Sequence, residues 1–195
     1  LDILSVLETD LDTPDTLADY LKEFPRGQVP DQTQAKKAID AAYRTADESE
    51  DAGVQIVSIL EDLYPERLKA IPDPPPIIHA KGDLGGLSAD ISVALIGTRQ
   101  PSEFGKNSAR LFGQHLAKLG SIVVSGLALG CDSEGHLGCL EAGGITVAVL
   151  AHGLHKVSPS SNLELANQIV DNGGCLITEQ NFGVEPHRSF FVQRN

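Results

Sequence analysis

Short apolar segments alternate with longer amphipathic segments along the second half of this sequence. The apolar segments predict strands at residues 93–96, 121–124, 145–150 and 175–178. The amphipathic segments predict helices at residues 105–119, in a stretch ending at 142, and at residues 161–172. Strands that alternate with helices in this way are typical of a parallel sheet covered on both faces. We therefore predict an α/β fold, an extended Rossmann-like parallel sheet with helices on both faces, preceded by a small N-terminal helical region.

Two of these helices can be described more closely from the sequence. In the helix at 105–119, four apolar residues recur at helical spacing and are predicted to form the buried face: Ala109, Phe112, Leu116 and Leu119. The helix at 161–172 opens with Ser161-x-x-Glu164, which is a capping-box pattern.

The first ninety residues have a different organisation. Helical spacing at 16–24 and 34–46, interrupted by prolines and a glycine, predicts a small helical accessory region at residues 1–52. Strands are predicted at 54–60 and 77–80, joined by a proline-rich extended connector at 64–76 and followed by a loop at 85–90. We assign residues 53–195 to the Rossmann-like domain and expect this domain to be truncated at its C-terminal end.

The charge of the chain is unevenly distributed, which bears on whether a nucleic acid can be its partner. The formal net charge is −12, and this argues against a broad basic surface for phosphates. Residues 1–90 hold 19 acids and 8 Lys or Arg, whereas residues 91–195 hold 8 acids and 7 Lys or Arg. The acidity therefore belongs to the first part, and a local basic pocket in the second part is still allowed.

The three cysteines, Cys131, Cys139 and Cys175, are odd in number and lack CxxC spacing. This pattern favours buried, reduced thiols over a disulfide framework or a zinc site. Reduced thiols, the lack of a membrane-length apolar run and the lack of a signal-peptide pattern together favour a cytoplasmic protein with no membrane partner. No motif points to a metal ion or another cofactor, so we expect neither.

The loops after the predicted strands hold the candidate binding residues, because ligands of open α/β sheets bind at the carboxyl ends of the strands. After the first strand comes Gly97-Thr98-Arg99, where glycine permits a close backbone approach to phosphate and Arg99 can grip it with two donors. A tight turn with a solvated arginine is the alternative. After the second strand, Ser125 and Gly126 can offer a hydroxyl and an N–H, while capping the next helix is the favoured role of Asp132.

The later loops add cationic and aromatic side chains. His155 and Lys156 follow the third strand, and Arg194 and Asn195 stand at the end of the sequence. Three aromatic residues could stack on bases, although core packing is the more common role, above all for the last: Phe182, Phe190 and Phe191. There is no phosphate-binding P-loop, paired-carboxylate loop or assignable Ser-His-Asp set, and a lone helical His136 is more often packed than catalytic. We therefore expect no enzyme.

Taken in order, these segments resemble the DprA/Smf family of DNA-processing proteins. The resemblance runs from about Gly53 to Asn195. It rests on the following residues: Tyr64-Pro65-x-x-Leu68, Ile71-Pro72-Asp73-Pro74-Pro75, Lys81-Gly82, Gly97-Thr98-Arg99, Ser125-Gly126-Leu127-Ala128-x-Gly130-x-Asp132, His136 with Leu140, Gly153-Leu154, Pro159-x-x-Asn162, Glu179 and Phe191-x-x-Arg194-Asn195. Each segment is common by itself, but their order and intervals are specific.

The resemblance implies a non-catalytic single-stranded-DNA-binding protein, typically a homodimer, that protects incoming DNA and helps to load the RecA recombinase in natural transformation. The DNA site of this family is a positively charged pocket. With the resemblance, we predict that the DNA or phosphate site comprises Gly97, Thr98, Arg99, Ser125, Gly126, Lys156, Asn162, Arg194 and Asn195.

Three positions depart from the family pattern. Leu129 stands where many members have Lys, Ser158 where they have Tyr, and His155 where they have Asp. The sequence leaves open whether Lys156 replaces the phosphate contact that is lost at Leu129.

Two other functions stay open on the sequence alone. Related Rossmann-like families bind or hydrolyse nucleotides, although the Pro-Gly-Gly-x-Gly-Thr-x-x-Glu motif of the lysine-decarboxylase-like phosphoribohydrolases is missing here. The second open function is that of a scaffold, which only binds proteins through residues 1–52.

Overall fold

The computed structural model describes residues 31–88 and 91–194. The described residues fall into two units, the helix α3 (Gln32–Asp51) and a body that begins at Ala52. The helix predicted at 16–24 lies outside the described residues, and so does Asn195. The assignment of an accessory region and a main domain stays a prediction.

The helix α3 extends beyond the predicted helix at 34–46 at both ends, and a side-chain cap fixes its start. Asp31 Oδ1 accepts the Gln34 N–H at 2.8 Å, and Gln34 Oε1 accepts the Asp31 N–H at 3.0 Å. This reciprocal capping pair has the form of a capping box. At the other end, Gly53 adopts a φ of +67°, a left-handed conformation that commonly ends a helix.

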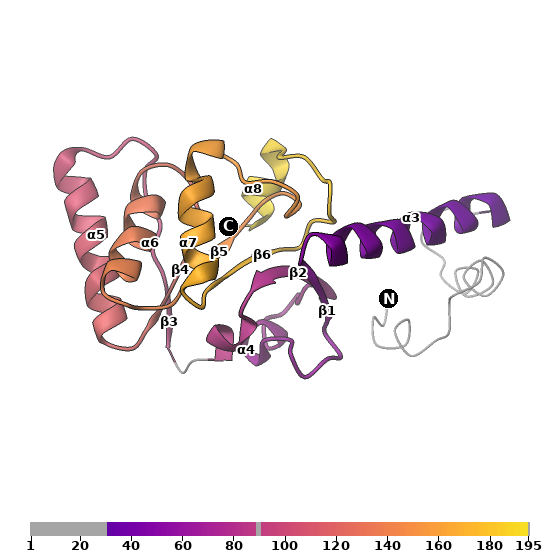
Figure 1. Cartoon of the computed structure of the whole chain (residues 1–195), viewed down its shortest axis with the longest axis horizontal. Helices are drawn as coiled ribbons and strands as arrows, with labels where there is room; N and C mark the ends of the chain where they lie inside the picture. The colour runs from indigo at the N-terminus through magenta and orange to yellow at the C-terminus, as the bar shows by residue number, and fades with distance from the viewer. Residues whose placement is uncertain (1–30, 89–90, 195) are drawn as a thin grey trace. The chain divides into compact units, whose positions relative to one another are not determined.

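The body is built on a six-stranded mixed sheet (Figure 1). Its strands are β1 (Gln55–Ser58), β2 (Ile77–Gly82), β3 (Ser92–Ala94), β4 (Ile122–Ser125), β5 (Thr146–Val149) and β6 (Cys175–Thr178), and they lie in the order β1-β2-β6-β5-β4-β3. β3, β4, β5 and β6 pair in parallel, whereas β2 pairs antiparallel with both β1 and β6. The predicted α/β class is confirmed, but the parallel sheet carries an antiparallel pair at one edge.

Helices lie against both faces of the sheet. α5 (Glu103–Lys118), α6 (Cys131–Glu141) and α7 (Leu163–Asp171) lie side by side across one face (Figure 1). The apolar core beneath them is formed mainly by Leu127, Ala148, Leu150, Leu165, Ile169 and Leu176. The short helices α4 (Glu66–Lys69) and α8 (Arg188–Arg194) border a groove of about 760 Å³ on the opposite face, which is lined by Val124, Val149 and Ile177 of the sheet.

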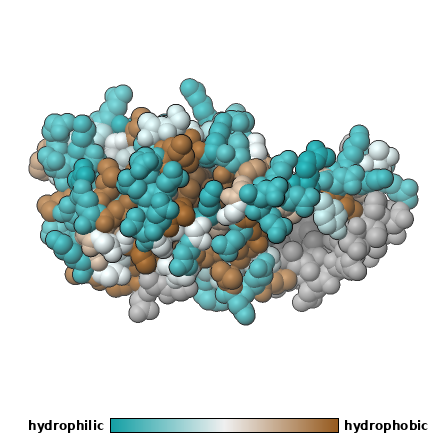
Figure 2. Space-filling view, in the orientation of Figure 1, coloured by the Kyte–Doolittle hydropathy of each residue, from teal (hydrophilic) through white to brown (hydrophobic). Residues whose placement is uncertain are grey.

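The buried face predicted for the helix at 105–119 is only partly right. Ala109 is buried and Leu116 is half-buried, but the Phe112 and Leu119 side chains are 65% and 76% exposed. Figure 2 shows hydrophobic side chains among the hydrophilic ones on the surface of the body. The helix therefore does not bury its largest apolar residues.

Glycine contacts explain which face of α5 is buried. A Cβ added at Gly113 would lie 2.3 Å from the Gly135 carbonyl oxygen, and one added at Gly138 would lie 2.0 Å from the Arg110 carbonyl oxygen. The backbones of α5 and α6 therefore touch, and only glycine fits between them. Close backbone contact, rather than the size of apolar side chains, selects the buried face.

Several predicted boundaries also change. The predicted extended connector at 64–76 contains the helical turn α4, and the predicted loop at 85–90 contains the 3-10 helix η1 (Leu84–Ser88). The first parallel strand is β3 at Ser92–Ala94 rather than 93–96. The capping box predicted from Ser161 and Glu164 does not form, because the 3-10 turn η2 (Ser160–Asn162) precedes α7 and Asn162 occupies the N-cap without a side-chain cap bond.

Candidate nucleic-acid site

The loop after β3 lies exposed against the start of α6. The Cys131 N–H donates to the Thr98 carbonyl oxygen at 3.1 Å, and Thr98 Oγ1 accepts the Gln100 N–H at 3.2 Å. A Cβ at Gly97 would lie 2.6 Å from Cys131 Cβ, and one at Gly130 would lie 2.4 Å from the Thr98 oxygen. The glycines therefore let the loop lie directly on the α6 N-terminus, and Arg99 is exposed beside it.

Two arginines meet at one aromatic ring. The Arg99 Cζ lies 5.5 Å from the centroid of the Phe191 ring, and the Arg194 Cζ lies 6.0 Å from it. Both distances are within the range of cation–π attraction. Phe191 and Arg194 are three residues apart on α8 and so lie on the same helix face. Among the described residues, the guanidinium of Arg99 has no hydrogen-bonded acid or carbonyl, which leaves its donors available to a ligand.

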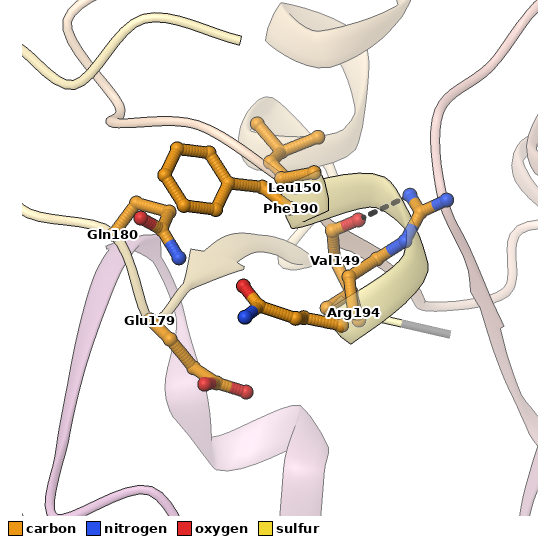
Figure 3. Close-up of a pocket in the computed structure, with 8 residues that line it drawn as sticks. Val149, Leu150, Glu179, Gln180, Phe190 and Arg194 are labelled. Atoms are coloured by element: carbon orange, nitrogen blue, oxygen red, sulfur yellow. Dashed lines mark hydrogen bonds between the residues drawn. The ribbon is translucent and has the colours of Figure 1, made fainter. Parts of the chain in front are cut away.

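Arg194 holds two strand ends together rather than pointing freely outward. Its Nη1 donates to the Val149 carbonyl oxygen at 2.9 Å (Figure 3). It also donates to the Gly126 carbonyl oxygen at 3.0 Å, so it bridges the ends of β4 and β5. Burial lowers the pKa of Arg194, Asp132 acts in the opposite direction, and the nearby positive charge of Arg99 lowers it further. Part of its donor capacity is therefore used inside the fold.

The loop after β4 directs its polar groups inward, against the orientation that we expected. The Ser125 hydroxyl, which is buried, donates to the Leu95 carbonyl oxygen at 2.5 Å. Asp132 Oδ2 accepts the N–H groups of Gly126 at 3.1 Å and Ala128 at 3.3 Å. Asp132 therefore stabilises the loop instead of capping α6, and the Ser125 hydroxyl and the Gly126 N–H are already paired.

Asn162 has the same internal role. Its side chain is buried and Nδ2 donates to the Leu127 carbonyl oxygen at 2.8 Å and to Ser133 Oγ at 2.9 Å. Leu127 itself is buried in a left-handed conformation, with a φ of 55°. Such a conformation is uncommon for leucine and needs support from its surroundings. Asn162 and Asp132 supply this support for the loop on which α6 begins.

Lys156, the predicted cation of the loop after β5, is paired with an acid of the loop after β6. The Lys156 ammonium forms an ion pair with Glu185, and His155 Nε2 lies 3.4 Å from the same carboxylate. Hydrogen bonds from Lys156 and from His155 lower the pKa of Glu185. The predicted positive charge of this loop is therefore largely neutralised within the chain.

The three phenylalanines have different surroundings. Phe182 packs against the core and makes an edge contact with His155, with centroids 5.8 Å apart. Phe190 makes a similar contact with His187 and lines a small pocket beside Leu150 (Figure 3). Phe191, for which core packing was favoured, is half-buried and lies close to both arginines.

The structure thus brings Gly97, Thr98, Arg99, Gly126 and Arg194 together around one cluster, which we call the Arg99 cluster and which also contains Phe191. Ser125 and Asn162 support this cluster from inside, and Lys156 belongs to the separate Glu185 pair. Sequence reasoning missed the position of Phe191 and the role of Glu185. The spacing of Phe191 and Arg194 was a usable signal for the first, whereas nothing in the sequence links Glu185 to Lys156.

Metal clusters and membrane-length apolar helices are both absent from the described ranges. Across residues 31–88 and 91–194, no group of three or more His, Cys, Asp or Glu side chains is arranged to hold a metal ion. The helices in those ranges are too short or too polar to cross a bilayer.

Several known proteins that are similar to this chain belong to one family. A profile of the DNA recombination-mediator protein A family matches residues 55–195. The DNA processing protein DprA of Bacillus subtilis is 34% identical over 155 residues, which are 80% of this chain and 50% of that protein. The protein Smf of Synechocystis is 34% identical over 156 residues, which are 78% of this chain and 39% of that protein. The chain therefore spans half or less of the length of these two relatives.

Solved structures of the same family share the fold. DprA from Streptococcus pneumoniae matches 99% of this chain and 71% of its own, with a TM-score of 0.70 and 25% identity. DprA from Helicobacter pylori, whose structure concerns a single-stranded-DNA binding mode, matches 72% of this chain and 62% of its own, with a TM-score of 0.63 and 29% identity. By its sequence and its fold, this chain belongs to the DNA recombination-mediator protein A family, the DprA/Smf family of DNA-processing proteins.

Proposed function

We propose that this chain binds single-stranded DNA without catalysing a reaction, and that Arg99 is its main phosphate contact. The observation that carries this proposal is the exposed Arg99 guanidinium beside the second guanidinium of Arg194. Two neighbouring positive charges repel each other, so an anion placed near both is bound more favourably than one near a single charge. The binding of single-stranded DNA by the related DprA of H. pylori supports the same choice of ligand.

The start of α6 favours the same position for a phosphate. The loop of Thr98 and Arg99 lies against Gly130, the N-cap of this helix, and the N-terminus of a helix favours negative charge. Asp132 and Glu134 in the first turn of α6 oppose an anion there, although Asp132 is engaged by two backbone N–H groups. Arg99 therefore has to supply most of the attraction.

The proposal is tested by titrating a fluorescein-labelled oligo-dT with the protein and measuring fluorescence anisotropy at several salt concentrations. We expect Arg99→Ala to weaken binding about ten- to a hundredfold, because a hydrogen-bonded charge is worth roughly 1.5–3 kcal/mol. The slope of log affinity against log salt should fall by about 0.7 for one lost phosphate contact. Lys118→Ala, which removes a positive charge from the last turn of α5, is the matched control. Equal binding by wild type and Arg99→Ala contradicts the proposal.

We further propose that the chain acts as a homodimer in the cytoplasm, protects incoming DNA and helps to load a RecA-type recombinase. The description of the family as a recombination mediator supports this role, and three free cysteines fit a reducing compartment. Light scattering after size-exclusion chromatography tests the dimer. The rate at which RecA replaces a single-strand-binding protein on DNA, with and without this chain, tests the loading. A monomer, or an unchanged rate, contradicts the corresponding part.

A further inference from the structure

We propose that Glu185 is an internal competitor of DNA phosphate: its carboxylate occupies the Lys156 ammonium in the free protein and must leave it before Lys156 can contact a phosphate. This inference rests on the proposed binding of single-stranded DNA. In this proposal, Glu185 controls how many positive charges of the protein are available to single-stranded DNA.

The pair joins two loops that follow neighbouring strands. Lys156 lies after β5 and Glu185 lies after β6, and β5 and β6 are hydrogen-bonded in parallel, so both loops stand at the same edge of the sheet. Arg99 follows β3, which runs parallel to β4 and β5 in the same sheet. All three side chains therefore belong to the strand-end side on which ligands of α/β sheets bind.

A carboxylate and a phosphate diester present the same chemistry to an ammonium group. Each offers anionic oxygens that accept charge-assisted hydrogen bonds, so only one of them can fully occupy Lys156. The Glu185 side chain is 69% exposed and the Lys156 side chain is 39% exposed, so water competes for both partners. An exposed ion pair of this kind is weak enough for a polyanion to displace it.

His155 provides a second hydrogen-bond donor that faces the Glu185 carboxylate. The Gly183 N–H donates to His155 Nδ1 at 3.2 Å, so the ring proton of the neutral imidazole is on Nε2, which faces Glu185 Oε1 at 3.4 Å. The carboxylate therefore has donors from two adjacent residues. Displacement by phosphate would leave the same two donors facing the new anion.

Other contacts hold the two loops together when the charge of Glu185 is removed. The Gly153 N–H donates to the Val184 carbonyl oxygen at 2.8 Å, and Phe182 packs against both His155 and the core. Glu185→Gln keeps the shape and the acceptor oxygen of the side chain but not its charge. The variant thus separates the electrostatic role of Glu185 from a purely structural one.

The experiment measures the affinity of the full chain for a fluorescein-labelled oligo-dT by anisotropy, at several salt concentrations. We expect Glu185→Gln to bind roughly two- to fivefold more tightly than wild type, the range that corresponds to one exposed ion pair. Its salt slope should steepen by about 0.7, as expected for one further phosphate contact. Glu66→Gln is the matched control, since Glu66 is another exposed glutamate that faces a lysine, with Lys69 3.9 Å away.

Lys156→Gln completes a double-mutant cycle. In the wild-type background it should change the affinity little, because Glu185 already neutralises the lysine. In the Glu185→Gln background it should remove the whole gain, so the two effects should not add.

The outcomes separate this inference from the proposed function. If wild type and Glu185→Gln both fail to bind the oligonucleotide, the proposed function fails. If wild type binds and Glu185→Gln binds equally or more weakly, or if its effect is matched by Glu66→Gln, the inference is overturned while the proposed function stands. Additive effects of the Lys156 and Glu185 variants overturn it as well. A tighter, more salt-sensitive Glu185→Gln complex supports both.

Discussion

Acidification from pH 7.5 to pH 5 should destabilise this protein through His136, a buried histidine on α6. Its Nδ1 lies 2.7 Å from Thr146 Oγ1, and that hydroxyl donates its own proton to the Val123 carbonyl oxygen at 2.7 Å. Thr146 can therefore only accept from His136, which places the ring proton on Nδ1. The other nitrogen, Nε2, is buried and has no hydrogen-bond partner among the residues that the structure describes. A second proton would have to be added at this buried atom.

The size of the effect follows from the pKa. Burial lowers the pKa of His136 to about 3 in the folded protein, against roughly 6.5 for an unperturbed histidine. Between these two pKa values the unfolded chain binds more protons than the folded one. The free energy of unfolding is therefore not reduced by this group above about pH 6.5, and it falls as the pH drops towards 3. At pH 5 this one group should cost about 2 kcal/mol of the free energy of unfolding.

Urea unfolding followed by circular dichroism at pH 7.5 and pH 5 measures this loss. Burial also lowers the pKa of His79 and His152, so wild type is expected to lose more than His136 alone accounts for. The control is His136→Gln, which is neutral at both pH values. Its free energy of unfolding should fall less than that of wild type between the two pH values, by the share of His136. An equal fall in both proteins would show that His136 does not remain neutral in the folded state and would refute the reasoning.

Two further substitutions test the packing and the loop support described above. Gly138→Ala should lower the free energy of unfolding by about 1–3 kcal/mol or more, because its Cβ would overlap the Arg110 carbonyl oxygen and push α5 away from α6. A Cβ at Gly105 would lie 3.1 Å from its nearest neighbour, Pro101 Cβ. Gly105→Ala should therefore change the free energy of unfolding by less than about 1 kcal/mol in the same urea titration. Asn162→Ala should cost about 1–3 kcal/mol by leaving buried polar groups unpaired, while the folded variant keeps the oligo-dT affinity of wild type in the anisotropy assay. A loss of affinity at unchanged stability would instead place Asn162 in contact with DNA.

The strand and helix alternation could be predicted because it depends on local composition, whereas the packing of the helices could not. β5 and β6 are almost entirely buried apolar runs, and such runs are visible in any sequence. The buried face of α5 follows instead from Gly113, which matters only because Gly135 of α6 lies against it. A pattern rule that rewards large apolar residues selects Phe112, and the structure leaves that residue exposed.

The candidate site shows the same division between position and orientation. The rule that ligands bind at strand ends pointed to loops that the structure brings together around Arg99. It could not say which way their polar groups point, because Ser125 and Asn162 pair with groups of distant segments, Leu95 and Leu127. A small polar residue at a strand end can serve the ligand or the loop, and only the partner in the fold decides between these roles.

An acidic chain can bind a polyanion only where its own acids are already engaged. At 0.15 M salt, exposed charges act over roughly 8 Å, so the acids that matter are those within reach of the binding residues. Asp132 accepts two backbone N–H groups, Glu134 is paired with Arg110 and Glu185 is paired with Lys156, so these three acids have partners within the fold. Arg99 has no hydrogen-bonded acid or carbonyl among the residues that the structure describes, and it lies within the Arg99 cluster. For this reason the loss of the Arg99 charge and the loss of the Glu185 charge should move the DNA affinity in opposite directions, and each should do so more than the loss of a remote charge.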